Sequence, residues 1–348
     1  MCFFRILIML IFAFSSLSLV ANDDELKVLD SYVSHRATYM ERKQTRIQQI
    51  KRQLKRGISV EEQLRVYNKM FGEYYTYSFD SAKVYIDKGL RIARLHNNKR
   101  YIDNFTIHRG LLLATGGYYS QAEAVLKSID VEQLHPSLLF NYYYSMTWLY
   151  NFWSAYCHDK EFSPIYNQLR MQYLDKAIAH APSGSAMYNY LMGEKYYYGG
   201  LSTDVGLTYY QKVLKQVPIT DRLYASSAYA IARGYKSLKK AALYESYLIK
   251  AAISDQVCPL KENLALQELS LYLYEKDSKY SGRAVTYIYC SMEDAQFYNN
   301  RLRMLEISHI LPRIVATYQT QINQRTTIIY WALGGLSLFA VVLLMMIV

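Results

Sequence analysis

Residues 110–126, GLLLATGGYYSQAEAVL, carry the clearest pattern in the chain. Gly110 falls on one predicted helix, Gly117 and Tyr119 form a turn, Ala122 begins a second helix, and Leu126 follows one turn later. A glycine without a side chain lets two helices approach closely, and a second glycine supplies the turn between them. These five positions, in this order, predict two antiparallel helices packed as a hairpin.

Weaker copies of the same pattern lie on both sides of this hairpin. The tetratricopeptide repeat is a 34-residue unit of two antiparallel helices, with small residues where the helices cross. We therefore predict about six such hairpins between Val60 and Met292, and an all-α, tetratricopeptide-like helical solenoid. The copies are marked by Ser81, Ala82, Tyr85, Ile86 and Ala93; by Leu174, Ala177 and Pro182; by Tyr188, Leu191, Gly199, Gly200 and Pro218; by Ala230, Gly234, Ala242 and Tyr247; and by Leu271, Tyr274, Ala284, Tyr287 and Ile288.

Both ends of the chain are apolar. Arg5, an apolar run over residues 6–20 and the small Ala21 are typical of a secretory signal peptide, which we assign to residues 1–21, with an uncleaved signal anchor as the alternative. Residues 326–348 carry no charge. A helix of that length spans about 35 Å, enough to cross a hydrocarbon core of about 30 Å. We therefore predict a transmembrane helix over 326–348.

Export would place the repeats in the periplasm and the span in the inner membrane as a single pass. The positive-inside rule then expects Lys or Arg after Val348, where the sequence stops. Either the natural chain continues into the cytoplasm, or it ends inside the membrane.

A polar helix is predicted over about residues 26–54, within an N-terminal segment 22–59 that precedes a repeat domain over 60–325. Its apolar positions follow a heptad spacing when two basic residues are included: Leu29, Val33, Arg36, Met40, Lys43, Ile47, Ile50 and Leu54. Such a seam suits a capping helix that packs on the first repeat. A short coiled coil, and with it a homodimer contact, is the alternative.

The charge balance is basic, with a formal net charge of +11. Much of the excess lies between Arg36 and Arg56, where Glu41 is the single acid. Such a balance suits nucleic acid or an anionic membrane surface. Because export argues against direct contact with nucleic acid, a solvated basic face is the simpler interpretation.

Three cysteines remain after the signal peptide, an odd number for an oxidising compartment: Cys157, Cys258 and Cys290. The positions of Cys258 and Cys290 near one end of the same predicted hairpin leave a disulfide between them open. No paired Cys/His spacing points to a metal.

The sequence shows no catalytic or cofactor-binding constellation, so we predict a non-enzyme and assign no catalytic, cofactor, metal or binding residue. Cys157 and His158 are adjacent, and their side chains would diverge on a helix. Asp80-Ser81 and Glu293-Asp294 place acids near predicted helix ends, where capping is the simpler role.

Tyrosine is unusually frequent, with 37 copies that include the runs 142–144 and 196–198. Three consecutive residues spread around a helix, so the rings of one run cannot share one buried face. Aromatic filling between the repeat helices is the simpler interpretation. The alternative is that some hydroxyls line a concave groove and bind a peptide or glycan.

Several stretches carry a family resemblance: YSFDSA at 77–82, AISD at 252–255, KENLAL at 261–266, DAQFYNNRLR at 294–303 and ISHILP at 307–312. Together they resemble a Bacteroidetes family of tetratricopeptide-containing, membrane-anchored transcriptional regulators, a domain-of-unknown-function family. The resemblance implies a periplasmic sensor domain, one inner-membrane span, a cytoplasmic coiled coil and a C-terminal regulatory region. This sequence lacks the cytoplasmic part.

These observations predict the periplasmic sensor domain of a single-span regulator, which recognises a periplasmic protein, peptide or glycan without catalysis. The alternative is a structural scaffold for an envelope protein complex that has no sensing role.

Overall fold

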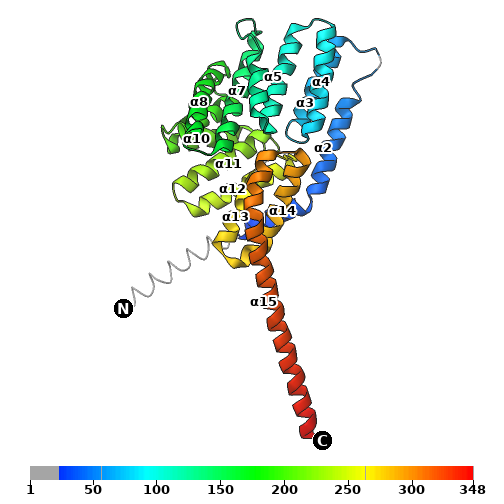
Figure 1. Ribbon diagram of the computed structural model, residues 1–348, viewed down its shortest axis with the longest axis vertical. Helices are drawn as coiled ribbons and strands as arrows, with labels where there is room; N and C mark the ends of the chain where they lie inside the picture. Colours follow the sequence, from blue (N-terminus) through cyan, green and yellow to red (C-terminus); the bar gives the residue numbers. More distant parts are fainter. Residues whose placement is uncertain (1–22, 56, 263, 348) are drawn as a thin grey trace.

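The computed structural model describes residues 23–347, apart from residues 56 and 263. Within this part the chain folds into helices and contains no strand, which confirms the predicted all-α class. The helices form a curved body from which one long helix extends (Figure 1). The predicted signal peptide, residues 1–21, lies outside the described residues.

Twelve helices in the described part pair as six consecutive antiparallel hairpins, as the repeat pattern predicts. In each hairpin the first helix packs on the second, and neighbouring hairpins stack on each other. The hairpins are α3 (Val60–Tyr74) with α4 (Phe79–Leu95), α5 (Lys99–Thr115) with α6 (Tyr119–Lys127), α7 (Pro136–Cys157) with α8 (Phe162–His180), α9 (Ala186–Tyr198) with α10 (Thr203–Gln216), α11 (Arg222–Ser237) with α12 (Ala241–Val257), and α13 (Ala265–Lys276) with α14 (Ser281–Tyr298), the last pair joined by the 3-10 turn η1 (Ser278–Tyr280).

Local sequence explains where these helices cross and turn. A Cβ atom built on Gly110 would lie 2.4 Å from Cγ of Leu126, so only glycine allows α5 and α6 to approach this closely. Gly117 has a φ of +86°, the left-handed conformation that glycine adopts without strain. Ala122 and Leu126 are fully buried. The crossing predicted from residues 110–126 is therefore confirmed.

The N-terminal segment is not one continuous helix. Residues 23–34 are helical, the helix breaks at His35, and α2 (Arg36–Lys51) follows. Leu29 and Val33 are buried in the core of the last two repeats, whereas Ile47 is buried in the core of the first. The residues of the heptad seam therefore pack on repeats of the same chain. The prediction of a single helix was wrong because the two halves pack on opposite ends of the repeat array.

The two basic residues in the seam form ion pairs inside the structure. Lys43 is buried and binds Glu73 of α3 at 2.9 Å. Arg36 binds Asp294 and Glu293 of α14, and Lys261 binds the same Asp294 at 2.5 Å. The expectation that Glu293-Asp294 caps a helix was wrong, because both residues lie within α14 and hold α2.

The first and last repeats also contact each other directly. The hydroxyl of Tyr298 donates to the backbone oxygen of Tyr75 at 2.7 Å, and the backbone N–H of Lys261 donates to the oxygen of Thr76 at 2.8 Å. The ring of Phe79 packs edge-on against that of Tyr298. We call these the closure contacts. They bring residues far apart in the sequence, 223 positions for Tyr75 and Tyr298, to one side of the body.

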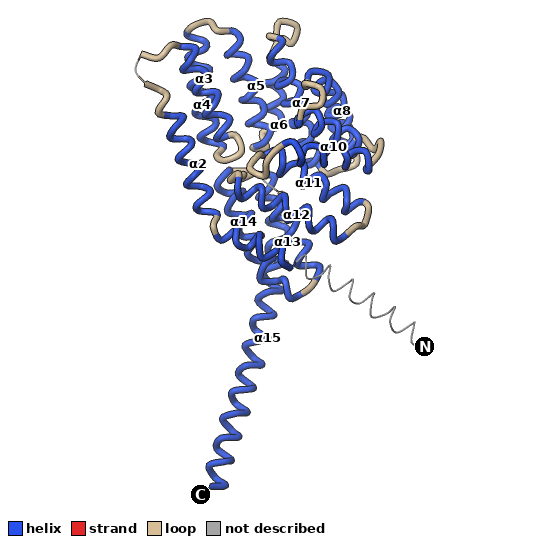
Figure 2. The backbone as a smooth tube through the Cα atoms, turned by 180° about the vertical axis from the view of Figure 1, so that it is seen from behind, coloured by secondary structure: helices blue, strands red, loops and turns tan. Residues whose placement is uncertain are grey.

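Helix α15 (Arg301–Ile347) begins against the repeats and then leaves them (Figures 1 and 2). Leu302, Ile307 and Ile314 are buried in the body, whereas every described side chain from residue 322 onward is exposed. Within the described residues, α15 is the one helix long and apolar enough to cross a membrane. Cys157, Cys258 and Cys290 are free thiols.

Candidate functional site

A pocket of about 290 Å³ lies at the centre of the repeat body. The first helices of three successive hairpins form its walls, each with residues spaced four apart, which is the spacing that keeps side chains on one helix face. The remaining wall comes from the end of α12, the loop before α13, and α15. The spaced positions are Tyr144, Trp148 and Phe152 on α7; Tyr190, Glu194 and Tyr198 on α9; and Arg222, Ser226 and Ala230 on α11.

Aromatic rings form one side of this pocket. The ring of Trp148 stacks on that of Tyr190, with centroids 6.2 Å apart and an angle of 19° between the planes. Tyr144 meets Trp148 edge-on, and Phe152 packs against it with centroids 5.7 Å apart. Since neighbouring rings fix one another, this wall is a preformed apolar surface of the kind that small-molecule sites use.

Glu194 is an acidic residue of the pocket, and each of its two carboxylate oxygens accepts a hydrogen bond. Its carboxylate accepts from Arg170 of α8 at 2.5 Å and from the hydroxyl of Tyr210 at 2.8 Å. The Arg170 guanidinium also lies over the ring of Tyr198, 4.5 Å from its centroid. Burial raises the pKa of Glu194, and its partners offset this only in part. This cluster fixes α8, α9 and α10 to one another behind the pocket wall.

Three N–H donors at the pocket meet no acceptor in good hydrogen-bond geometry within the described part of the chain: Nε1 of Trp148, which has only the Tyr144 hydroxyl nearby, Nε of Arg222 and Nε of Arg303. One other nitrogen of each guanidinium group is bound to a carboxylate. Arg222 binds Glu262 at 2.9 Å and lies over the ring of Tyr75, whereas Arg303 binds Glu306 at 2.8 Å. Buried donors in folded proteins are almost always paired, so three orphans at one cavity point to an absent partner.

Asp255 contributes a hydrogen-bond acceptor to the pocket, in contrast to these donors. Its side chain is buried at the pocket wall, and its carboxylate makes no hydrogen bond or ion pair with the described residues. Burial raises the pKa of Asp255 well above its ordinary range, and the nearby carboxylates of Glu262 and Asp294 raise it further. An isolated buried carboxyl group is unfavourable unless a donor reaches it. The pocket therefore offers both unused donors and an unused acceptor.

The tyrosine runs are distributed as their spacing requires. Within residues 142–144, Tyr142 is buried in a core and Tyr144 lines the pocket. Within residues 196–198, Tyr196 stacks on Tyr209, and Tyr198 lines the pocket. One ring of each run reaches the concave side, and the others pack between helices.

Sequence reasoning assigned no binding residue and therefore missed Trp148, Arg222, Asp255 and Arg303. The available signal was the aromatic spacing at 144, 148 and 152 on a predicted first helix, because this face of successive repeats lines the concave side. Cys157-His158, set aside as a catalytic pair, ends α7, where His158 adopts a left-handed φ of 46°. No group of three His, Cys, Asp or Glu residues suited to a metal occurs in the described part.

The model of the SusR N-terminal TPR domain family matches residues 33–309, which include α2 and all six hairpins. The chain belongs to this family. The match supports the tetratricopeptide part of the resemblance seen in the sequence, and tetratricopeptide domains are generally non-catalytic interaction modules. A comparison with curated proteins found no match.

The SusR-type domain ends before the exposed part of α15. The matched region stops at residue 309, while α15 continues to Ile347. All the pocket residues described above, from Tyr144 to Arg303, lie inside the matched region.

Proposed function

We propose that this chain is the sensor part of a single-span membrane regulator, and that its central pocket binds a short periplasmic glycan. The observation that carries the proposal is the combination of stacked aromatic rings with three unpaired donors and one unpaired carboxyl group in a single cavity.

The chemistry of the pocket favours a ligand rich in hydroxyl groups. A hydroxyl group donates one hydrogen bond and accepts others, so it satisfies both Asp255 and the orphan N–H groups of Arg222 and Trp148. The flat wall formed by Trp148 and Tyr190 suits the apolar face of a sugar ring. A short peptide also carries donors and acceptors, and the experiment below separates the two.

Exposed apolar side chains on α15 support a membrane span. Ile328, Tyr330, Trp331 and Phe339 are each more than half exposed, and a run of such residues in water is strongly unfavourable. A helix satisfies its own backbone groups within the segment, so it is stable in lipid. With the signal-like residues 1–21, this supports a periplasmic repeat domain on an inner-membrane anchor.

We propose recognition without catalysis. Of the ionisable groups that line the pocket, Glu194, Arg222, Glu262 and Arg303 are held in ion pairs, and Asp221 caps α11. An envelope scaffold remains the alternative, and it predicts that the pocket binds no small molecule.

Binding to the full chain in detergent micelles tests the proposal. Calorimetric titration with di-, tri- and tetrasaccharides, and separately with tripeptides, is expected to show saturable binding of a saccharide. Trp148→Phe removes an N–H donor of the pocket, and Asp255→Asn replaces one carboxylate oxygen by an NH2 group. Each variant is expected to weaken binding about tenfold, equivalent to about 1.4 kcal/mol.

Tyr289→Phe, an exposed change on α14, is the matched control and should leave affinity unchanged. Binding of tripeptides alone would replace the glycan by a peptide. Absence of binding by both classes, or equal affinity in all variants, would reject the pocket as the ligand site and favour the scaffold.

A further inference from the structure

Helix α15 supplies one wall of the pocket as well as the apolar segment. Arg303 lies in its first turn, lines the pocket, and has a side chain that is 10% exposed. Nη1 of Arg303 binds Glu306 on the same helix, while Nε has no partner in the described part of the chain. The helix that leads to the membrane thus presents one unused donor at the ligand cavity.

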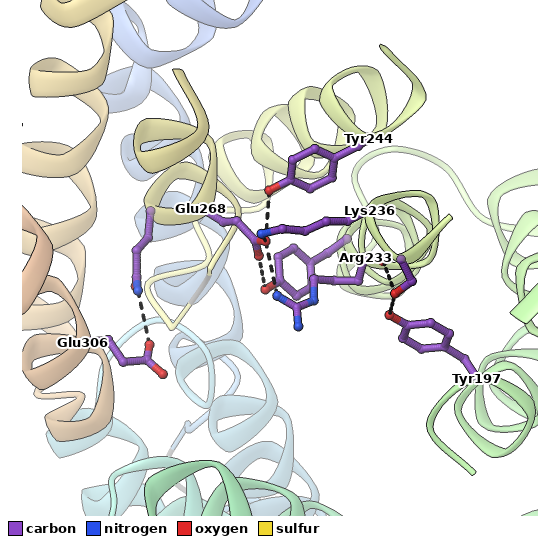
Figure 3. A network of polar contacts seen from close by, with 9 residues as sticks. Tyr197, Arg233, Lys236, Tyr244, Glu268 and Glu306 are labelled. Atoms are coloured by element: carbon purple, nitrogen blue, oxygen red, sulfur yellow. Dashed lines mark hydrogen bonds and ion pairs between the residues drawn. The ribbon is translucent and has the colours of Figure 1, made fainter. Parts of the chain in front are cut away.

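A polar network connects the same pocket to α15 by a second route (Figure 3). The hydroxyl of Tyr229, which lines the pocket, donates to Glu268 of α13 at 2.6 Å. The preceding residue of α13, Gln267, donates through Nε2 to Glu306 at 3.3 Å. Glu306 therefore receives Arg303 from its own helix and Gln267 from α13, and it lies at the junction between the repeats and α15.

Glu268 is a firm anchor for this route. Besides Tyr229, it accepts from the hydroxyl of Tyr244 at 2.9 Å, from Lys236 at 2.8 Å and from Arg233 at 3.2 Å (Figure 3). Burial alone would raise the pKa of Glu268, but Arg233 and these hydrogen bonds outweigh it and hold the pKa below its ordinary value. The α13 end of the junction is therefore fixed, and the α15 end depends on the Arg303–Glu306 pair.

We infer that Arg303 contacts the ligand, and that through Arg303 occupancy of the pocket changes how α15 packs on the repeats. This inference rests on the proposed function of the pocket. A ligand group that binds Nε of Arg303, or an aromatic ring that stacks on its guanidinium, draws that group toward the cavity and weakens its pair with Glu306. Glu306 then binds Gln267 differently, and the α13–α15 junction shifts.

The geometry of α15 carries such a shift to the membrane. Arg303 and residue 326 lie on one continuous helix, about 35 Å apart at about 1.5 Å per residue. The start of the helix is held by Arg301, whose guanidinium lies 3.9 Å from the ring centroid of Tyr118. Pro312 lies within this helix and removes one of its backbone hydrogen bonds, so a small displacement near Arg303 changes how residues 304–325 pack on the repeats and, beyond Pro312, the direction of the exposed part.

The test uses the full chain in detergent micelles and needs no ligand. Ser226 lines the pocket on α11, so Ser226→Trp fills the cavity and replaces an occupant. Hydrogen exchange of the amides in residues 304–325 reports how firmly α15 is seated. Gln121→Trp, which adds the same ring at an exposed position on α6, is the matched control.

Ser226→Trp is expected to change the exchange rates in 304–325 by about fivefold or more, the usual lower range of coupling between sites. The Gln121→Trp control is expected to change none of them.

In an Arg303→Ala background the Ser226→Trp response should disappear, and Arg303→Lys should restore only part of it. Glu306→Gln, which keeps Arg303 but removes its ion pair, should also abolish the response and serves if Arg303→Ala does not fold.

A response to Ser226→Trp that persists in both Arg303→Ala and Glu306→Gln would overturn the inference, as would no response in the wild-type background. A purely structural Arg303 would lower stability without altering the response. Because no ligand is used, these outcomes are separate from saccharide binding: a chain that binds saccharides but gives no α15 response refutes this inference and leaves the proposed function standing.

Discussion

The hydroxyl of Tyr298 donates to the backbone oxygen of Tyr75 at 2.7 Å, and this bond joins the last repeat to the first. Both residues are buried, so water cannot replace the donor. Tyr298→Phe should lower the free energy of unfolding by about 1–2 kcal/mol, because a buried carbonyl group is left unpaired. Urea unfolding followed by circular dichroism measures this. Tyr289→Phe, on the exposed side of α14, should change the value little; an equal loss in both variants would mean that the closure bond contributes nothing.

Asp294 holds two cations, Arg36 and Lys261, in a buried position between α2 and the last repeat. Asp294→Ala leaves both charges without this partner and should destabilise the fold by about 3–5 kcal/mol. The adjacent Glu293 also binds Arg36, but its side chain is 68% exposed. Glu293→Gln should therefore change stability by no more than about 1 kcal/mol. Similar losses in the two variants, measured by urea unfolding, would contradict a buried role for Asp294.

Gly110 and Gly72 both lie within helices but differ in their surroundings. A Cβ on Gly110 would overlap Leu126, whereas a Cβ on Gly72 would meet no atom within 4 Å. Gly110→Ala should destabilise the protein by about 1–3 kcal/mol through overpacking. Gly72→Ala should stabilise it by about 0.5–1 kcal/mol, because alanine loses less backbone entropy in a helix. Thermal unfolding of both variants tests the opposite signs, and a loss in both would show that α3 also needs glycine.

His108 makes the fold sensitive to acid. Burial lowers the pKa of His108 from 6.5 to about 3, and the ring stacks on Phe71 while Nε2 bonds Asn68 at 2.7 Å. Between pH 6.5 and about 3, the unfolded state therefore binds a proton on His108, whereas the folded state does not. The resulting stability is present above pH 6.5 and is lost as the pH falls toward 3.

At pH 4.5 this loss amounts to about 2–3 kcal/mol. His108→Gln keeps a hydrogen-bonding side chain that does not titrate in this range. Its free energy of unfolding should consequently fall less than that of the wild type between pH 7 and 4.5. Parallel curves for the two proteins would show that His108 is charged when folded.

Local pattern was sufficient for the hairpins but not for the pocket. The positions Gly110, Gly117 and Leu126 interact within one repeat, so their spacing alone defines the crossing. Asp255 and Arg222 share the α11–α12 hairpin, but they meet Trp148 of α7 and Arg303 of α15 only because successive repeats curve around the pocket. That curvature is a sum of small rotations between repeats, which residue spacing in one sequence does not reveal.

The N-terminal helix shows the same limit from another side. Its heptad spacing continues unbroken on both sides of His35, so the sequence predicts one helix. The structure breaks it there, because Leu29 and Val33 pack on the last repeats while Ile47 packs on the first. The tertiary contacts at the two ends of the array override the local pattern.

Asp255 should limit stability while it serves binding. Its pKa is raised when folded, so the folded state binds a proton more tightly than the unfolded state does. Stability from this group is full below the unfolded pKa near 3.8, and it falls as the pH rises through the folded pKa. Asp255→Asn removes the penalty for a buried charge. The gain in the free energy of unfolding over wild type should therefore be larger at pH 7 than at pH 4.

The same variant keeps one acceptor oxygen but replaces the other by an NH2 group and loses the charge, so its saccharide affinity should fall while its unfolding midpoint rises. Urea midpoints at pH 4 and pH 7, measured beside calorimetric titration, test both effects on one sample. Asp277→Asn is the matched control, since Asp277 is exposed, lies outside the pocket and caps η1 through the N–H of Lys279 at 2.9 Å. A gain in stability that is equal at both pH values would show that Asp255 is not strained by burial, and loss of both stability and binding would make it a structural residue.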